Sequence, residues 1–187
     1  LIVIIAILAA LLLPALDTAR ERARSVACLS NERQIGRTIM LYADDHGGRM
    51  PSWGWGPGGF DETRWNVHLS KYCGTPIREY DDASILGTIF DCPTSQGWYG
   101  ANYGYNIDLP PPHGWDARSV HPVYYRIREP SEVKLVADAS YIWIGWNSNY
   151  VLRHNGKQRQ IGLLYCDLHA AMISEQEYRS TRSRGYD

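Results

Sequence analysis

Leu1–Leu16 reads LIVIIAILAALLLPAL, and this stretch decides how the rest of the chain can fold. It contains no charged side chain and none that requires a hydrogen-bond partner. A helix needs roughly 20 predominantly apolar residues to cross a bilayer, and this run approaches that length. We therefore expect residues 1–16 to form a hydrophobic membrane helix, which Pro14 should kink or loosen. A retained anchor is favoured over a cleaved signal peptide, because no clean small-residue cleavage site follows.

The helix is expected to continue as an amphipathic segment over residues 17–47. Ile35, Ile39 and Tyr42 recur at helical spacing on one stripe, while Arg33 and Arg37 fall on other faces. The pair Gly47-Gly48 favours the end of the helix. A helix over the first 45 residues would be roughly 67 Å long, so part of it must protrude from a small domain.

The composition limits what the remainder can be. The 187 residues carry a net charge of −1, with no long block of like charge, which disfavours a nucleic-acid partner. Seven Trp and 13 Tyr stand against two Phe, a bias towards rings with a polar group that suits half-wet surfaces and interfaces. Four cysteines allow three pairings and none forms a Cys-x-x-Cys motif, so disulfides are plausible in a domain outside the cytoplasm.

Residues 48–187 should form one globular head. A short helix is expected over Glu62–Tyr72, and a strand or short helix over Ile85–Cys92. Residues 95–122 are rich in Gly, Tyr, Asn and Pro and show no period, which predicts a long loop. Its rings argue against disorder and are expected on the surface, with an aromatic carbohydrate-binding platform as the alternative. These rings are Trp98, Tyr99, Tyr103, Tyr105 and Trp115.

The last third predicts an antiparallel sheet over about residues 133–173, packed on the helix. Short apolar runs separated by turn residues read as strands. After them, Ser174 and Glu177 have the spacing of a capping box for a short helix through Tyr178. The fold class is therefore α+β, with a long N-terminal helix on a small antiparallel head. The expected strands are Val133–Ala137, Tyr141–Ile144, Tyr150–His154, Ile161–Tyr165 and Ala170–Ile173.

Four polar residues fall at the ends of predicted strands: Asp138, His154, Asp167 and His169. If they converge at one sheet edge, their carboxylates and imidazoles could bind a divalent metal through mixed N and O ligands. The simpler interpretation makes them turn-forming and structural hydrogen-bonding residues. The chain has no Gly-x-Ser-x-Gly elbow, His-Glu-x-x-His or Walker loop, so we expect no enzyme and no catalytic residue.

These features resemble a known family. The apolar run with its internal proline and the segment that follows are similar to the N-terminal part of type IV pilin-like proteins and type II secretion pseudopilins. More narrowly, the chain resembles bacterial prepilin-type proteins named for a C-terminal His…Asp-Gly motif. The matching motifs are Cys28-Leu29-Ser30-Asn31, Gln34-Ile35-Gly36, Tyr42-Ala43-Asp44-Asp45, Pro51, Phe90-Asp91-Cys92-Pro93, Tyr103-Gly104-Tyr105-Asn106, Pro130-Ser131-Glu132-Val133 and Ala137-Asp138.

The resemblance implies processing by a prepilin peptidase, about half a dozen mature residues before Leu1, and a docking Glu among them. The element Asp167-Leu168-His169 matches the family's Asp-Gly-His only in part, so a turn that needs positive φ at Leu168 must differ or be strained. The spacing from His154 to Asp167 is longer than the family's and implies an extended hairpin loop over 156–160.

Two further expectations follow from the resemblance. Cys28 and Cys92 stand where family members often have cysteine, which implies a Cys28–Cys92 disulfide and leaves Cys73 to pair with Cys166. Some pseudopilins bind calcium, so Ca²⁺ or another divalent metal is a candidate cofactor, with Asp44-Asp45 or Asp81-Asp82 as further ligands.

The resemblance also implies a structural function. The chain is expected to be a subunit of a type IV pilus-like extracellular filament, with itself, the inner membrane and the assembly machinery as partners. A periplasmic pseudopilin and a membrane-anchored carbohydrate-binding domain are the alternatives. The residues expected to form the filament core or membrane segment are Leu1, Ile2, Val3, Ile4, Ile5, Ile7, Leu8, Leu11, Leu12, Leu13, Pro14 and Leu16.

Overall fold

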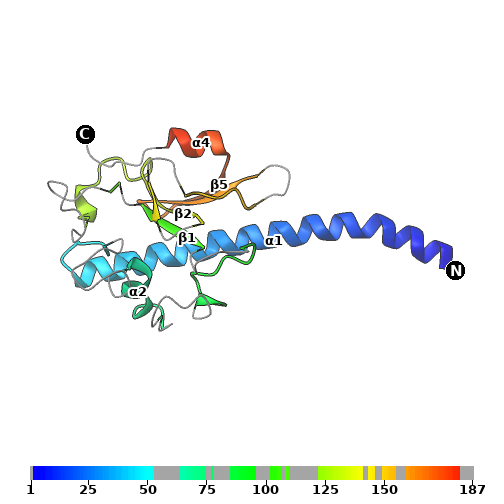
Figure 1. Cartoon of the computed structure of the whole chain (residues 1–187), viewed down its shortest axis with the longest axis horizontal. Coiled ribbons are helices and arrows are strands. Elements are labelled where there is room, and N and C mark those ends of the chain that lie inside the picture. The colour runs from blue at the N-terminus through cyan, green and yellow to red at the C-terminus, as the bar shows by residue number, and fades with distance from the viewer. Residues whose placement is uncertain are drawn as a thin grey trace.

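The computed structural model has one long helix packed on a small sheet, which confirms the α+β prediction (Figure 1). The structure describes residues 2–52, 64–74, 77, 85–95, 102–106, 108–109, 122–140, 143–145, 149–154 and 159–181. Within these residues the helices are α1 (Ile2–Asp45), α2 (Trp65–Ser70), the 3₁₀ helix η2 (Tyr124–Arg126) and α4 (Glu175–Ser180). The strands are β1 (Tyr103–Asn106), β2 (Lys134–Asp138), β3 (Trp143–Ile144), β4 (Ile161–Tyr165) and β5 (Ala170–Ile173).

Helix α1 has two halves with different surroundings. Its 44 residues form a single element that continues across Pro14, so the proline does not end the helix. The apolar N-terminal half projects beyond the head, and all of its described residues are exposed (Figure 1). By length and composition it is apolar enough to cross a membrane, which is compatible with membrane anchoring or a signal sequence. The C-terminal half buries one stripe: Ser25, Cys28, Glu32, Ile35, Gly36, Thr38, Ile39, Tyr42 and Ala43.

The end of α1 follows from its glycines. Gly47 adopts a left-handed conformation with φ of 64°, and the Gly48 N–H donates to the Ala43 carbonyl at 2.7 Å. This is the bond of a Schellman motif, which satisfies a carbonyl that the end of the helix would leave unpaired. The predicted helix end near residue 45 is confirmed.

The five strands are arranged in the order β3-β1-β2-β4-β5. Neighbouring strands are antiparallel, except that β3 runs parallel to β1 at one edge. The sheet is therefore not the simple meander that the sequence predicts, because β1 lies between β3 and β2. Strand β1 comes from the stretch predicted to be a loop. That prediction is wrong at Tyr103 and Tyr105, which are buried in the sheet and not on the surface.

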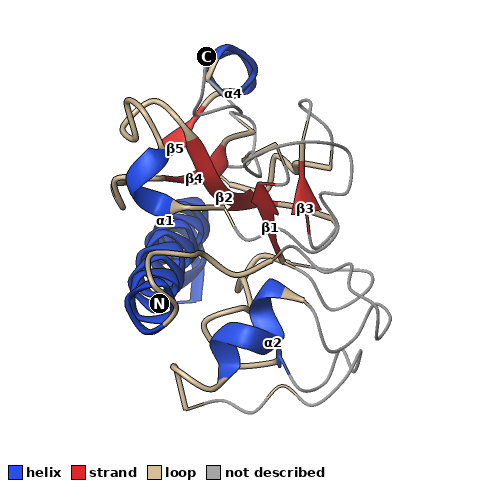
Figure 2. Cartoon of the chain, turned by 90° about the vertical axis from the view of Figure 1, so that its left-hand side faces the viewer, coloured by secondary structure: helices blue, strands red, loops and turns tan. Residues whose placement is uncertain are grey.

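Both faces of the sheet are covered (Figure 2). Alternate residues of β4 point to opposite sides: Leu164 belongs to the core that includes α1, whereas Ile161 and Leu163 belong to a second core. Tyr178 of α4 completes the second core. The Ser174–Glu177 capping box predicted for α4 is present. Strands β4 and β5 have the predicted bounds.

Among the other predicted elements, one is wrong and one is shorter than expected. Where a strand or a short helix is expected over Ile85–Cys92, Ile85 is helical and turns follow it, without a strand, and the Asp91 N–H donates to the Thr88 carbonyl. Tyr150–His154 forms no strand with the described residues and takes part in isolated bridges, one of them between His154 and Gln160. That bridge closes the base of the expected hairpin loop, of which residues 155–158 lie outside the described part. Helix α2 is confined to Trp65–Ser70.

Gly36 allows α1 to approach the sheet closely. A Cβ atom at this position would lie 2.9 Å from Leu164 Cδ2 of β4 and 3.0 Å from Leu168 Cδ2. Cβ contacts this short are rare, so a larger residue must displace the Leu164 and Leu168 side chains or the helix itself. Packing at this contact is therefore sensitive to volume.

We expect Gly36→Val to destabilise the protein by about 1–3 kcal/mol, because added methyl groups overpack this contact. Urea unfolding of the full chain in mild detergent measures the loss. The matched control is Arg37→Val, which places the same side chain on the exposed face of the same helix. Equal stability of the two variants would contradict the close approach described.

Candidate functional site

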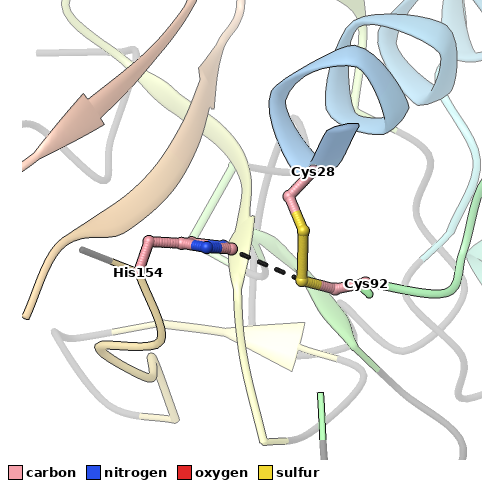
Figure 3. A group of neighbouring side chains, drawn as sticks. All are labelled: Cys28, Cys92 and His154. Carbon is pink, nitrogen blue, oxygen red and sulfur yellow. Dashed lines mark hydrogen bonds between the residues drawn. A yellow bond between two sulfur atoms is a disulfide. The ribbon is translucent and has the colours of Figure 1, made fainter. Parts of the chain in front are cut away.

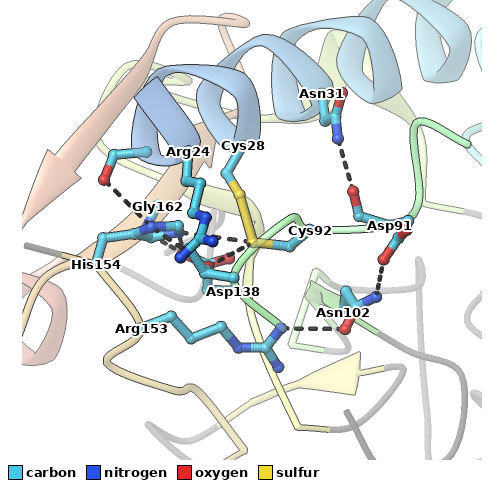
Figure 4. The surroundings of a disulfide bond; sticks show 12 residues. Arg24, Cys28, Asn31, Asp91, Cys92, Asn102, Asp138, Arg153, His154 and Gly162 are labelled. Atoms are coloured by element: carbon cyan, nitrogen blue, oxygen red, sulfur yellow. Dashed lines mark hydrogen bonds and ion pairs between the residues drawn. A yellow bond between two sulfur atoms is a disulfide. The ribbon is translucent and has the colours of Figure 1, made fainter. Parts of the chain in front are cut away.

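A disulfide joins α1 to the head. Cys28 of α1 and Cys92, which are 64 residues apart in sequence, are bonded, with their Cα atoms 5.4 Å apart (Figure 4). Both residues are buried. The disulfide implied by the family resemblance is therefore present.

The second implied disulfide is wrong, since Cys73 and Cys166 are both free. Their thiols face different backbone carbonyls: Cys73 that of Leu69 at 3.4 Å, and Cys166 that of Lys134 at 3.8 Å. Burial raises the pKa of the Cys166 thiol well above its usual value. A buried neutral thiol of this kind is a core residue and a poor nucleophile.

Asp91 reinforces the link beside the disulfide. Its backbone carbonyl accepts a hydrogen bond from Asn31 of α1 at 2.8 Å, and its Oδ1 accepts one from Asn102 at 3.0 Å. Asn102 also accepts from Arg153 at 3.2 Å. The two motifs around Cys28 and Cys92 thus contact each other through both a covalent bond and a side-chain hydrogen bond (Figure 4).

His154 and Asp138 form the polar centre of the site. The His154 Nε2 atom lies 3.0 Å from Asp138 Oδ2, and both side chains are completely buried. The other ring nitrogen, Nδ1, lies 3.3 Å from the Ser25 hydroxyl of α1. That hydroxyl donates to the Glu21 carbonyl at 3.0 Å, so its oxygen is left to accept from Nδ1–H.

The predicted four-residue metal set is divided between two ends of the sheet. In the β2–β4 register Ala137 pairs with Leu163 and Lys134 with Tyr165. Asp138 and Asp167 therefore lie beyond opposite ends of this ladder. His154 joins Asp138, whereas His169 pairs with Asp167 at 2.5 Å on an exposed turn. The four residues do not converge, because antiparallel strands place successive strand ends at opposite edges.

The exposed turn accommodates Leu168 in a strained conformation. Its φ is 71°, the left-handed region that favours glycine. The side chain compensates by packing, since it contacts the core beneath α1 and lies next to Gly36. The alternative of a strained turn at Leu168 is therefore the one observed.

Glu32 brings a second buried carboxylate close to Asp138. A Cβ atom at Gly162 of β4 would lie 2.6 Å from Glu32 Oε1 and 2.9 Å from Asp138 Oδ2, so both carboxylates lie over this glycine. Gly162 N–H donates to Asp138 Oδ2 at 2.7 Å. Both oxygens of Glu32, and Oδ1 of Asp138, have no hydrogen-bond partner among the described residues.

Burial and the nearby Asp138 raise the pKa of Glu32 well above its usual value, although Arg33 acts in the opposite direction. Desolvation is the larger cause, because it penalises the charged form of a carboxyl group. The same surroundings raise the pKa of Tyr103, whose hydroxyl lies 3.4 Å from the Cys28 carbonyl. The interface between α1 and the sheet therefore holds an excess of acidic groups away from water.

Four residues of this site, Ser25, Glu32, Asp91 and Gly162, are not predicted from the sequence patterns. A signal for Glu32 exists, since it lies four residues after Cys28 and three before Ile35, on the apolar stripe of α1. A carboxylate on a buried stripe marks a polar site. Nothing in the local pattern identifies Asp91 or Gly162, whose roles depend on contacts between distant segments.

The remaining candidate residues are not near this site or are not described. Asp45 accepts a hydrogen bond from the Tyr72 hydroxyl at 3.0 Å, and Asp44 is exposed. Asp81-Asp82 and the loop residues Trp98, Tyr99 and Trp115 lie outside the described residues.

Among the described residues, the donor atoms that lie close enough to share one metal ion belong to Cys28, Cys92 and His154. Comparisons with family models, curated proteins and solved structures find no match.

We expect Cys28→Ser to destabilise the protein by about 4 kcal/mol, the chain-entropy value for closing a loop of this length. Denaturant unfolding of the full chain in detergent measures the loss. Cys73→Ser, which removes a half-buried free thiol, should have little effect. Peptide mapping without reductant should find Cys28 joined to Cys92, and another pairing would contradict this assignment.

A second prediction concerns Glu32. Its raised pKa means that the folded state holds the proton more tightly than the unfolded state, whose carboxyl group has the ordinary value of 4.5. The wild type should therefore lose stability relative to Glu32→Gln as the pH rises above about 4.5, by at most about 1.4 kcal/mol per pH unit. Unfolding curves between pH 4 and 8 test this.

Asp44→Asn is the control, because it removes a charge from the exposed face of the same helix. It should keep the wild-type pH dependence. A stability difference between wild type and Glu32→Gln that is constant with pH would show that Glu32 is not protonated on folding.

Proposed function

We propose that this chain is a structural subunit of a type IV pilus-like extracellular filament, assembled through the N-terminal half of α1. The observation that carries the proposal is the contrast between the halves of this helix. The C-terminal half buries a stripe against the head, whereas the N-terminal half buries none of its apolar surface within the chain. An apolar surface of this extent needs another apolar environment.

Lipid and the helices of other subunits are both suitable environments. The exposed apolar side chains surround the N-terminal half on every side, as in a helix surrounded by lipid or by other helices. Burial stabilises such a surface by about 25 cal/mol per Å² in either setting. The inner membrane therefore holds the subunit first, and a second copy of α1 replaces lipid during assembly. Copies that associate head to tail without closing a ring form an open helical filament.

The site in the head suits a subunit of this kind. If α1 forms the filament core, any force between core and surface passes through the contact between α1 and the sheet. The Cys28–Cys92 disulfide and the Asn31–Asp91 hydrogen bond cross this contact. Assembly machinery of the pilus type and a location in the cell envelope belong to the same proposal.

A pseudopilin of a secretion pseudopilus is the second candidate, since it would use the same helix in the same way. The carbohydrate-binding alternative loses two of its rings, because Tyr103 and Tyr105 are each 1% exposed. Its remaining rings lie outside the described residues. We therefore place filament assembly first.

A charge within the apolar half tests the proposal. We expect Leu8→Lys to reduce both retention in the membrane fraction and the number of filaments seen by electron microscopy, because a lysine near a bilayer centre costs about 2.5–3.5 kcal/mol. Cells that contain the assembly machinery are used for both measurements.

Two controls separate the effect of the lysine charge in the apolar half from the effect of any substitution at Leu8 and from the effect of a lysine elsewhere. Leu8→Phe keeps the position apolar and should retain both properties. Leu86→Lys places the same charge at an exposed leucine of the head and should also leave both unchanged. Normal filaments from Leu8→Lys would rule out this segment as the filament core, and membrane retention without filaments in the wild type would favour a simple anchor.

A further inference from the structure

We propose that the reduced form of this protein binds one zinc-type divalent cation through Cys28, Cys92 and His154, with Asp138 as the fourth ligand. The two sulfur atoms and the imidazole of His154 all lie within 4.8 Å of one another (Figure 3). Two cysteines, a histidine and a carboxylate match the soft and borderline ligands that Zn²⁺ takes in tetrahedral sites. This inference does not depend on the proposed filament function.

The spacing of Cys28, Cys92 and His154 fits such a site. Asp138 lies beside His154 but outside the group whose donor atoms are all within 4.8 Å of one another, so its carboxylate must turn towards the metal. Zn–S bonds of about 2.3 Å and Zn–N bonds of about 2.0 Å place sulfur and nitrogen roughly 3.5 Å apart on a tetrahedron. Cys92 Sγ lies 3.7 Å from His154 Nε2, and Asp138 Oδ2 lies 3.0 Å from the same nitrogen. Side-chain rotation must separate the sulfurs to roughly 3.8 Å once their bond is broken.

The orientation of His154 leaves the correct nitrogen for a metal. In the tautomer with the proton on Nδ1, the Ser25 oxygen accepts from Nδ1–H, and Nε2 can bind a metal ion beside Asp138 and Cys92. A hydrogen bond at the second ring nitrogen is the usual way in which proteins fix a metal-bound histidine. Thr94 Oγ1 lies 3.0 Å from Cys92 Sγ and can donate to a thiolate there.

The surrounding charge also favours a cation. Asp138 and Glu32 are each 0% exposed, and three of their four carboxylate oxygens have no hydrogen-bond partner among the described residues. Buried carboxylates without partners are costly unless a positive charge or a proton neutralises them. A divalent ion beside Asp138 adds to the positive charge that the largely buried Arg153 already places near this carboxylate.

The disulfide and the metal are mutually exclusive. A thiol or phosphine reductant breaks the Cys28–Cys92 bond with two electrons and two protons, and is itself oxidised. As the two metal–sulfur bonds form, both thiols release their protons to solvent. The contact between α1 and the sheet is therefore closed by a covalent bond in the oxidised protein and by a metal ion in the reduced protein.

The test compares the two redox states of the full wild-type chain in detergent, with Co²⁺ alone as the probe. After reduction by a phosphine under anaerobic conditions, we expect one Co²⁺ per chain, with a thiolate-to-cobalt absorption band and the visible bands of a tetrahedral ion. Zn²⁺ should displace it and raise the melting temperature of the reduced protein. The oxidised protein retains Cys73 and Cys166 as free thiols and should show none of these signals.

Variants then assign the ligands. His154→Ala and Asp138→Asn should each weaken Co²⁺ binding by at least about 10-fold. Cys73→Ser should bind as the wild type does, and circular dichroism shows whether each variant is folded. The proposal is overturned if the reduced wild type gives no thiolate band, if the oxidised protein gives the same band, or if folded His154→Ala binds with unchanged affinity.

Discussion

The contact between the C-terminal half of α1 and strand β4 is the constraint on which the rest of the head depends. Gly36 lets the helix lie so close to Leu164 that the side chain of Leu168 can fill the adjoining space. In return, that packing supports a left-handed conformation which a leucine rarely adopts. The position of the helix and the geometry of the β4–β5 turn are therefore set together.

Polar groups share this apolar contact, and they do so at a cost. Burying Glu32, Asp138 and His154 removes charged or polar atoms from water, a loss that apolar residues of similar size would avoid. In return, the polar groups fix one arrangement of helix α1 against the sheet. Hydrogen bonds at Ser25 and Gly162 tie His154 and Asp138 to one register of helix and strand, which apolar packing alone would not fix.

The sequence predicts the elements that have their own periodicity and caps. The end of α1, strands β4 and β5, and the Ser174 cap of α4 all follow from local patterns. It does not predict β1, because Tyr103–Asn106 is a short run without alternation between two segments rich in turn residues. Nor does it predict that β1 inserts beside β2, since the pairing of distant strands is decided by packing of the whole head.

The candidate site likewise has a part that the sequence predicts and a part that it does not. The residue types that carry its chemistry are visible in the sequence, and Asp138 and His154 were both expected to be polar partners at strand ends. The grouping with Asp167 and His169 was wrong, because the register of antiparallel strands decides which ends meet. Cys28 and Glu32 complete the site from a helix that the strand pattern does not include. A single helix thus supplies both the apolar surface proposed for assembly and one side of the buried site. Changes in the site that loosen α1 from the sheet would alter the angle at which the apolar half leaves the head.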